Sequence, residues 1–138
     1  MTPFPHCRLI VFALIVAATC AFAAEYGEKV QFKKDVPIKF PDFSVTYLGQ
    51  RRVEVPVFKP GFLYYDFGID TPGGVRKTVS WSSGTGEIGP QLFDIRGHRY
   101  YLELKASVGY PGWLKHDEVV IWPEKAFQAA ARKKSGVN

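Results

Sequence analysis

The sequence predicts an all-β fold: an antiparallel β-sandwich or small barrel of about seven or eight short strands, followed by one short C-terminal helix. Apolar and polar residues alternate along several short segments, which is typical of half-buried strands. Clusters of Gly, Pro and Asp separate these segments at regular spacing and predict turns. Within the predicted mature domain, good helix formers gather after Pro123. We therefore expect a single β-rich domain.

The alternation is clearest from Phe43 to Tyr47, where apolar residues occupy every second position. A short leading strand is predicted around 29–32. The other predicted strands cover 53–57, 62–69, 75–82, 92–95, 98–105 and 118–122. Turns or breaks are predicted at 49–52, 59–61 and 70–74, and an irregular segment at 107–115. Val75, Val79 and Trp81 are expected to share a buried face, and the apolar run 118–122 predicts a strand buried on both faces.

A tight hairpin is predicted with a two-residue turn at Arg96-Gly97. Moving the turn to Gly97-His98 would place Arg96 opposite Arg99, and like charges in that position are destabilising. The predicted register instead opposes unlike charges, although it requires a positive φ at Arg96. It pairs Ile95 with His98, Asp94 with Arg99 and Phe93 with Tyr100, and it places Phe93, Ile95, Tyr100, Leu102 and Leu104 on the core face.

One helix is predicted from Glu124 to Lys134, with Pro123 at its first position. Glu124 lies near the positive end of the helix dipole, and the basic residues 132–134 lie near its negative end. Residues 123–138 therefore form a short helix with a basic tail, which closes the domain.

The first 23 residues predict a cleavable export signal. Arg8 precedes the apolar run 9–18, and Ala21-Phe22-Ala23 is a small-x-small cleavage site. The run is shorter than the roughly 20 residues that cross a bilayer stably. We therefore expect a mature domain of residues 24–138 in the periplasm or outside the cell. An uncleaved anchor is one alternative. Lipidation of Cys20 is another, because 17–20 weakly resembles a bacterial lipobox; the domain would then be tethered to a membrane.

Charge and cysteine content narrow the class of protein further. Both cysteines, Cys7 and Cys20, lie within the predicted signal, so the mature domain is expected to be free of disulfides. The net charge of +5 comes largely from Arg8 and the tail residues 132–134. Acids and bases are interleaved elsewhere, whereas a nucleic-acid-binding protein clusters its basic residues on one face. No nucleic-acid partner is predicted.

Two loops carry the candidate contact residues. Segment 82–90 is rich in Gly, and Ser83, Thr85 and Glu87 in it offer hydrogen-bonding groups to a ligand or partner. It lacks the Gly-Lys-Ser/Thr of a phosphate-binding loop and the Gly-x-Ser-x-Gly of a nucleophile elbow. Tyr110 and Trp113, in the second loop, are aromatic residues of the kind found at interfaces and in carbohydrate sites. The alternative for 82–90 is a plain connection between strands.

No catalytic, metal or cofactor site is predicted. His98 and His116, the histidines of the mature domain, have no partner at a spacing typical of metal ligation or of Ser/His or Cys/His catalysis. Carboxylates could still form an acid–base pair if the fold brought two of them together in one cleft. The candidates for such a pair are Asp66, Glu87, Asp94 and Glu103.

The sequence therefore favours a small exported, non-catalytic binding domain, such as an inhibitor- or immunity-like partner of a secreted or envelope protein. Its expected partner is a protein or a glycan of the envelope. A carbohydrate-binding accessory module is one alternative, and a carboxylate-dependent hydrolase acting on envelope polymers is another. The oligomeric state is left open.

Overall fold

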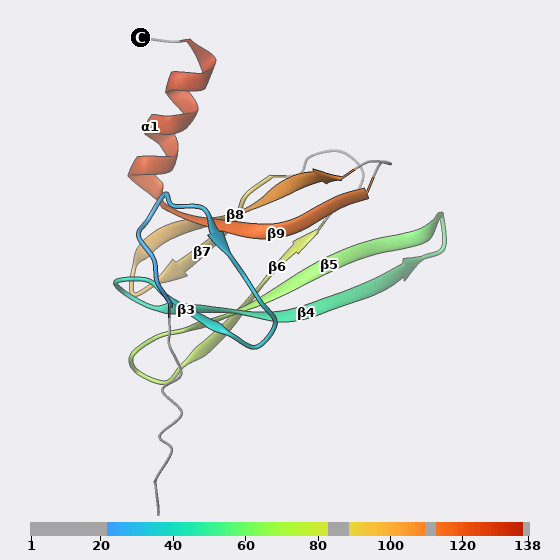
Figure 1. The fold of residues 1–138 in the computed structure, drawn as a ribbon, viewed down its shortest axis with the longest axis horizontal. Helices are drawn as coiled ribbons and strands as arrows, with labels where there is room; N and C mark the ends of the chain where they lie inside the picture. The colour runs from blue at the N-terminus through green and yellow to red at the C-terminus, as the bar shows by residue number, and fades with distance from the viewer. Residues whose placement is uncertain (1–21, 83–88, 110–112, 137–138) are drawn as a thin grey trace, which may run out of the picture.

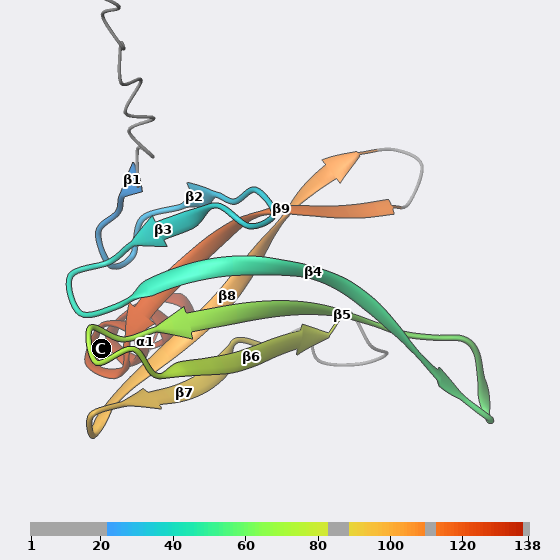
Figure 2. The same ribbon diagram turned by 90° about the horizontal axis from the view of Figure 1, so that it is seen from below.

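Two β-sheets face each other in the computed structural model, which describes residues 22–82, 89–109 and 113–136 (Figures 1 and 2). The first sheet has the spatial order β1 (Phe22–Ala23), β3 (Pro37–Lys39), β4 (Ser44–Val55), β5 (Phe58–Asp70) and β6 (Arg76–Ser82). The second has the order β2 (Val30–Gln31), β9 (Trp113–Pro123), β8 (His98–Gly109) and β7 (Gln91–Ile95). All neighbouring strands are antiparallel except β1 and β3. The predicted sandwich with one short C-terminal helix is confirmed.

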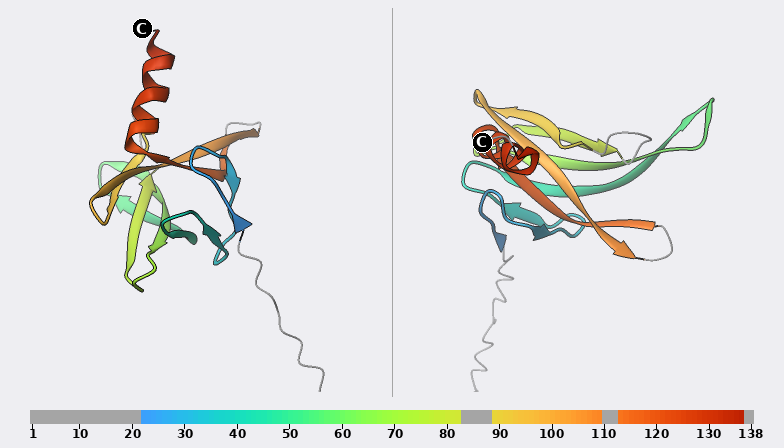
Figure 3. Two further views of the ribbon diagram at one scale, coloured as in Figure 1. Left: turned by 90° about the vertical axis from the view of Figure 1, so that its left-hand side faces the viewer. Right: turned by 90° about the horizontal axis from the view of Figure 1, so that it is seen from above.

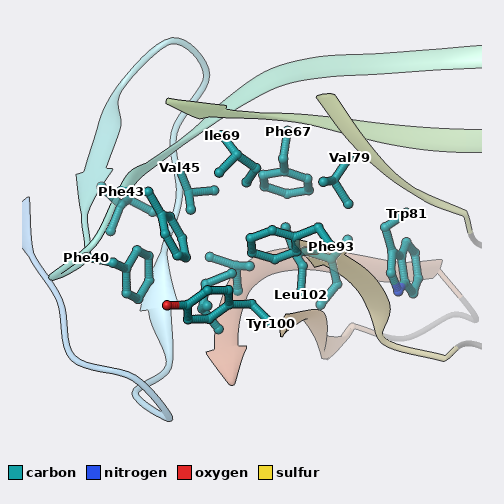
Figure 4. Close-up of a cluster of buried hydrophobic side chains, with 14 of the residues drawn as sticks. Phe40, Phe43, Val45, Phe67, Ile69, Val79, Trp81, Phe93, Tyr100 and Leu102 are labelled. Carbon is teal, nitrogen blue, oxygen red and sulfur yellow. The ribbon is translucent and has the colours of Figure 1, made fainter. Parts of the chain in front are cut away.

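The core between the sheets is largely aromatic (Figure 4). Phe67, Phe93 and Trp81 are among the largest fully buried side chains, and Phe43 meets Phe93 edge to face. All five residues predicted on the core face of the 92–105 hairpin are buried. Val79 and Trp81 are buried as predicted, but Val75 is 68% exposed, so that prediction was wrong. Val75 precedes the first residue of β6 and belongs to the turn.

The predicted hairpin register is confirmed. β7 and β8 pair Ile95 with His98, Asp94 with Arg99 and Phe93 with Tyr100. Arg96 and Gly97 both have positive φ, at 50° and 81°, as a two-residue hairpin turn with both centres left-handed requires. The favourable register of the strands therefore offsets the unfavourable conformation at Arg96.

β4 and β5 form one long hairpin, which corrects the predicted turn at 49–52 and the predicted break at 59–61. The chain reverses at Pro56-Val57 instead. Gly49 and Gly61 have positive φ and lie next to the two places where the register shifts. The glycines therefore absorb irregularities inside a continuous ladder, rather than ending the strands.

The predicted irregular segment 107–115 is also mostly strand. β8 continues to Gly109 and β9 starts at Trp113, with Val108 paired to Leu114 across the ladder. Its local composition suggested a loop, but the neighbouring strand supplies partners for its backbone groups. The register shifts once, between Lys105 and Ala106.

Helix α1 (Glu124–Ser135) follows β9 directly and points away from the sheets (Figures 1 and 3). Pro123 is the residue before the first helical turn, with φ −61° and ψ 145°, not the first helical residue as predicted. A proline holds this extended conformation readily and has no amide hydrogen to leave unpaired. The helix ends at Gly136, whose φ of 66° is left-handed.

The N-terminal segment contributes one short strand to each sheet. β1 pairs with β3, and the next residue, Ala24, is buried in the core and donates its backbone N–H to the Lys39 carbonyl at 2.8 Å. β2 then adds to the edge of β9. Cleavage after Ala23 would remove β1. Ala24 would then be the first residue, and its side chain is buried in the core. Among the residues described, no helix has the length and apolar character needed to cross a membrane.

Candidate functional site

The predicted contact residues fall largely outside the described part of the chain. Ser83, Thr85, Glu87 and Tyr110 are not described, and for Trp113 only its place at the start of β9 is given. The strand ends that flank the two loops, those of β6 and β8 among them, lie at the same end of the sandwich (Figure 2). The two loops therefore remain predictions.

The described carboxylates of the predicted acid–base set are separated and paired with bases. Asp66 lies between core-facing neighbours of β5, so it points out of the first sheet, where Arg51 Nε contacts it at 2.7 Å. Glu103 is flanked by core residues of β8 and points out of the second sheet. These two residues therefore lie on opposite outer faces of the sandwich. Asp94 also points out of the second sheet, with Arg99 Nε at 3.8 Å.

A largely apolar cavity lies between α1 and the outer face of the second sheet. β9 has core residues at Val119 and Ile121, so Val120 and Trp122 point to the other face. Val120 is nevertheless only 1% exposed, because α1 and its surroundings cover it. The prediction of a strand buried on both faces is thus confirmed at Val120, and the helix explains it.

An aromatic stack and an ion pair hold the helix beside the sheet: Arg99 Nη1 of β8 lies 3.5 Å from Glu124 Oε1 at the start of α1. Phe127 stacks on Tyr101 of β8, with ring centroids 4.2 Å apart and planes at 22°. No residue of α1 is fully buried. The helix therefore stands away from the sheet and leaves a groove of about 390 Å³ beside it.

We call this cavity the helix groove. Its apolar lining includes Val120, Trp122, Phe127, Ala130 and Ala131. On the helix these residues recur at the three- and four-residue spacing of one face. The volume lies in the range of ligand pockets, about 300–1,000 Å³. The helix groove can accept an apolar group of moderate size.

Positive charge surrounds this apolar lining. Lys29, Lys105 and Lys134 line the helix groove together with one acid, Glu103. Both Glu103 oxygens are engaged: Oε1 accepts a hydrogen bond from Lys105 Nζ at 2.6 Å, and Oε2 accepts one from Trp122 Nε1 at 3.0 Å. One acid balances one of the three lysines, so the helix groove has a net positive charge and favours an anionic occupant.

The wall of the helix groove at Trp122 is closely packed. A Cβ atom at Gly27 would lie 3.1 Å from Cζ3 of the Trp122 ring, and Gly27 has φ +86°. Glycine is the residue that fits both constraints. The N-terminal segment and Glu103 together hold the indole in place, so this wall exists before anything binds.

A second cavity, of about 520 Å³, lies beside the 96–97 turn and has several charged side chains in its lining. Asp42 and His98 line it, and Asp42 Oδ2 accepts hydrogen bonds from Tyr26 at 2.7 Å and from Tyr100 at 3.0 Å. These bonds hold the pKa of Asp42 below its ordinary value, while burial raises the pKa of Tyr26. The cluster fastens the N-terminal segment to both sheets. His98 thus faces this cavity, and the side chain of His116 is not described.

Sequence reasoning selected one residue of the helix groove, Glu103, as an acid–base candidate, and did not select the others. One signal was present: positions 119–122 are all apolar, so both faces of this strand need a cover. The spacing of Phe127, Ala130 and Lys134 places them on one side of the helix and supplies that cover. Gly27 and Lys29 come from far away in the chain, and nothing local in the sequence places them there.

Comparisons of the chain with protein-family models, with curated proteins and with solved structures give no match. Within the described residues, no group of three or more His, Cys, Asp and Glu side chains is placed to hold a metal ion.

Proposed function

We propose that this protein is an exported, non-catalytic binding domain that holds an acidic, apolar segment of a partner protein in the helix groove. The observation that carries the proposal is the helix groove itself, an apolar cavity of about 390 Å³ lined by three lysines and one acid. Apolar burial supplies affinity for such a segment, and the lysines supply charge complementarity.

The pairing of charges supports a binding role over catalysis. A general acid or base needs a carboxyl group that can reach its substrate's proton. Glu103, the carboxylate of the helix groove, has one oxygen on Lys105 and the other on Trp122. It serves to position the wall and one lysine of the helix groove.

A protein segment fits the helix groove better than a second copy of this helix. The last turn of α1 carries Arg132, Lys133 and Lys134, so two such helices would bring like charges together. An acidic segment would instead be attracted to this end of the helix, where the dipole is negative but three side chains are positive. The expected partner is therefore acidic as well as apolar.

Reversing one charge of the helix groove tests whether the helix groove binds anionic, apolar ligands. We expect Lys134→Glu to weaken binding of the anionic, apolar dye 8-anilinonaphthalene-1-sulfonate by roughly fivefold, which corresponds to about 1 kcal/mol for an exposed charge. Lys133→Glu is the matched control, because it makes the same change in the same helical turn but does not line the helix groove. Fluorescence titration at low salt measures both. Equal effects of the two variants would exclude the helix groove as the site.

The partner itself is tested by photocrosslinking in the native host. A crosslinking amino acid at position 131, which lines the helix groove, should capture the partner, whereas one at position 133 should not. Capture of a glycan-bearing polymer instead of a protein would favour the carbohydrate-binding alternative.

Export predicts a defined N-terminus. We expect the protein isolated from its host to begin at Ala24, because Ala21-Phe22-Ala23 has the small-x-small pattern of a cleavage site and Ala24 is buried in the core. The hydrogen bond from Ala24 N to the Lys39 carbonyl can persist after cleavage, since an ammonium group also donates. Intact-mass measurement decides the point. A mass that includes residues 1–23 argues for an uncleaved anchor, and a lipid adduct at Cys20 argues for a lipoprotein.

A further inference from the structure

β1 is the outermost strand of the first sheet, and signal cleavage would remove it (Figure 2). It runs parallel to β3, with Phe22 opposite Ile38 and Ala23 opposite Lys39. Cleavage after Ala23 takes away both residues of β1. Among the described strands, β3 then has no neighbour on this side. We call this side of Pro37–Lys39 the β3 edge.

One hydrogen bond shows which backbone groups face the β3 edge. Ala24 donates its N–H to the Lys39 carbonyl at 2.8 Å, so this carbonyl points toward the N-terminal segment. The N–H and C=O of one residue in a strand point to the same side, and those of its neighbours point to the other. Cleavage therefore leaves the Lys39 N–H and the Pro37 carbonyl facing a place that β1 has vacated.

Cleavage also creates a positive charge at the β3 edge. The side chain of Ala24 is held in the core, so the new α-amino group stays beside β3. The Lys39 carbonyl accepts one of the hydrogens of this ammonium group. Its other hydrogens and its charge favour an anionic acceptor. The β3 edge thus combines backbone groups ready for a new strand with a charge fixed at one end.

We propose, as an inference that rests on the export proposed above, that the β3 edge of the exported protein binds the C-terminal residues of a partner chain in parallel. A segment that follows the course of β1 runs directly toward Ala24. A partner chain that ends at this point presents its terminal carboxylate to the Ala24 ammonium, and the opposite charges attract. Main-chain hydrogen bonds to the β3 edge add affinity, as they do wherever a peptide extends a sheet.

Charge selects the C-terminal end of a chain over other segments. An internal segment would place neutral peptide groups beside the Ala24 ammonium. A chain that entered in the antiparallel direction would bring its N-terminal end to the same point, and two ammonium groups would repel each other. A C-terminal end supplies the opposite charge as well as the extended backbone, so it is the occupant that matches both features of the β3 edge.

A peptide titration of the exported protein tests the proposal. The probe is acetyl-Ala-Phe-Ala with a free carboxylate, which copies residues 21–23. Isotope-labelled protein is purified from its host, its mass is measured, and its backbone amides are followed by NMR. We expect the Lys39 amide to shift with a dissociation constant of about 1–10 mM, because so short a strand buries little area. The same peptide with a C-terminal amide should bind about fivefold more weakly, since it lacks the charge.

The full-length chain, purified without export, is the first control, because β1 still fills the β3 edge there. Lys39→Pro and Lys39→Ala form a matched pair. Both remove the side-chain charge, but only proline removes the N–H that faces the β3 edge. We expect peptide binding to be lost in Lys39→Pro and retained in Lys39→Ala, and circular dichroism establishes whether each variant folds. If Lys39→Pro does not fold, the full-length chain and the amidated peptide still decide the question.

The absence of a shift at Lys39 up to about 20 mM peptide would overturn the proposal. Equal binding by the full-length chain, equal binding of the amidated peptide, or equal effects of the two Lys39 variants would also overturn it. So would an isolated protein that still contains residues 1–23, because β1 then keeps its place. The helix groove lies on the other sheet, so loss of dye binding and loss of peptide binding can be told apart.

Discussion

Replacing Trp81 with alanine is expected to lower the free energy of unfolding by about 3–5 kcal/mol. Trp81 is 1% exposed, and its ring meets Tyr65 of the neighbouring strand edge to face at 5.7 Å. Alanine would remove most of this buried surface and leave a cavity that the surrounding rings can fill only in part. Small domains have a total stability of about 5–15 kcal/mol. The variant would therefore lose a large share of its stability.

Urea denaturation followed by circular dichroism measures this loss. Trp81→Phe should retain part of the burial and lose less than the alanine variant. Leu92→Ala provides the surface comparison, because Leu92 is 48% exposed and its replacement should change stability by less than about 1 kcal/mol. If Trp81→Ala behaved like Leu92→Ala, Trp81 would not belong to the core.

The burial of Trp81 helps to decide which part of the molecule can be a binding site. The strand that ends just after Trp81 leads into 82–90, one of the loops predicted to bind a partner. A Trp in the core is scaffold, so a function assigned to this region must rest on the loop itself. The loop's contact residues lie outside the described chain, and the functional proposal rests on the helix groove instead.

Local sequence patterns predicted the structure correctly where it depends on interactions between residues that are close in the sequence. The register of the 92–105 hairpin depends on residues that face each other across a two-residue turn, so charge and alternation determine it. The helix likewise depends on the composition of one short segment and on its dipole. In both cases the residues that determine the structure lie within one short segment of the sequence.

Prediction failed where a distant strand supplied the deciding contacts. The glycines at 49 and 61 resemble turn residues in sequence, yet β4 and β5 pair on both sides of each of them. The composition at 107–109 suggests a loop, yet β9 continues the ladder there. Cross-strand hydrogen bonds outweigh local propensity in these segments, because a strand's stability depends on its neighbours.

The helix groove could not be predicted from the sequence for the same reason. Its lining comes from the N-terminal segment, from β8 and β9 and from α1. The sequence indicated that 119–122 is apolar on both faces. It did not indicate that a helix lies far enough from this strand to leave a cavity. The contact between Phe127 and Tyr101 and the ion pair between Arg99 and Glu124 join the helix to the sheet.

Replacing Phe127 with alanine should release α1 from the sheet. Isolated helices shorter than about 12–15 residues are marginal in water, and α1 has 12 residues with none fully buried. Loss of the stacked ring is expected to cost about 2–3 kcal/mol of docking energy, less than for a fully buried Phe. Helical circular dichroism should fall, amides of 124–135 should exchange faster, and binding of 8-anilinonaphthalene-1-sulfonate to the helix groove should be lost.

Gln128→Ala is the control for this experiment. Gln128 is exposed on the same helix, and alanine there should slightly favour helix formation. Retention of full helicity in Phe127→Ala would show that other contacts hold α1, and the helix groove would then not depend on the ring. Loss of helicity with the β-sheet signal unchanged would show instead that α1 unfolds separately from the sandwich. In that case the Phe127 ring is required for the binding surface, because the helix supplies one wall of the helix groove and the sheet supplies the other.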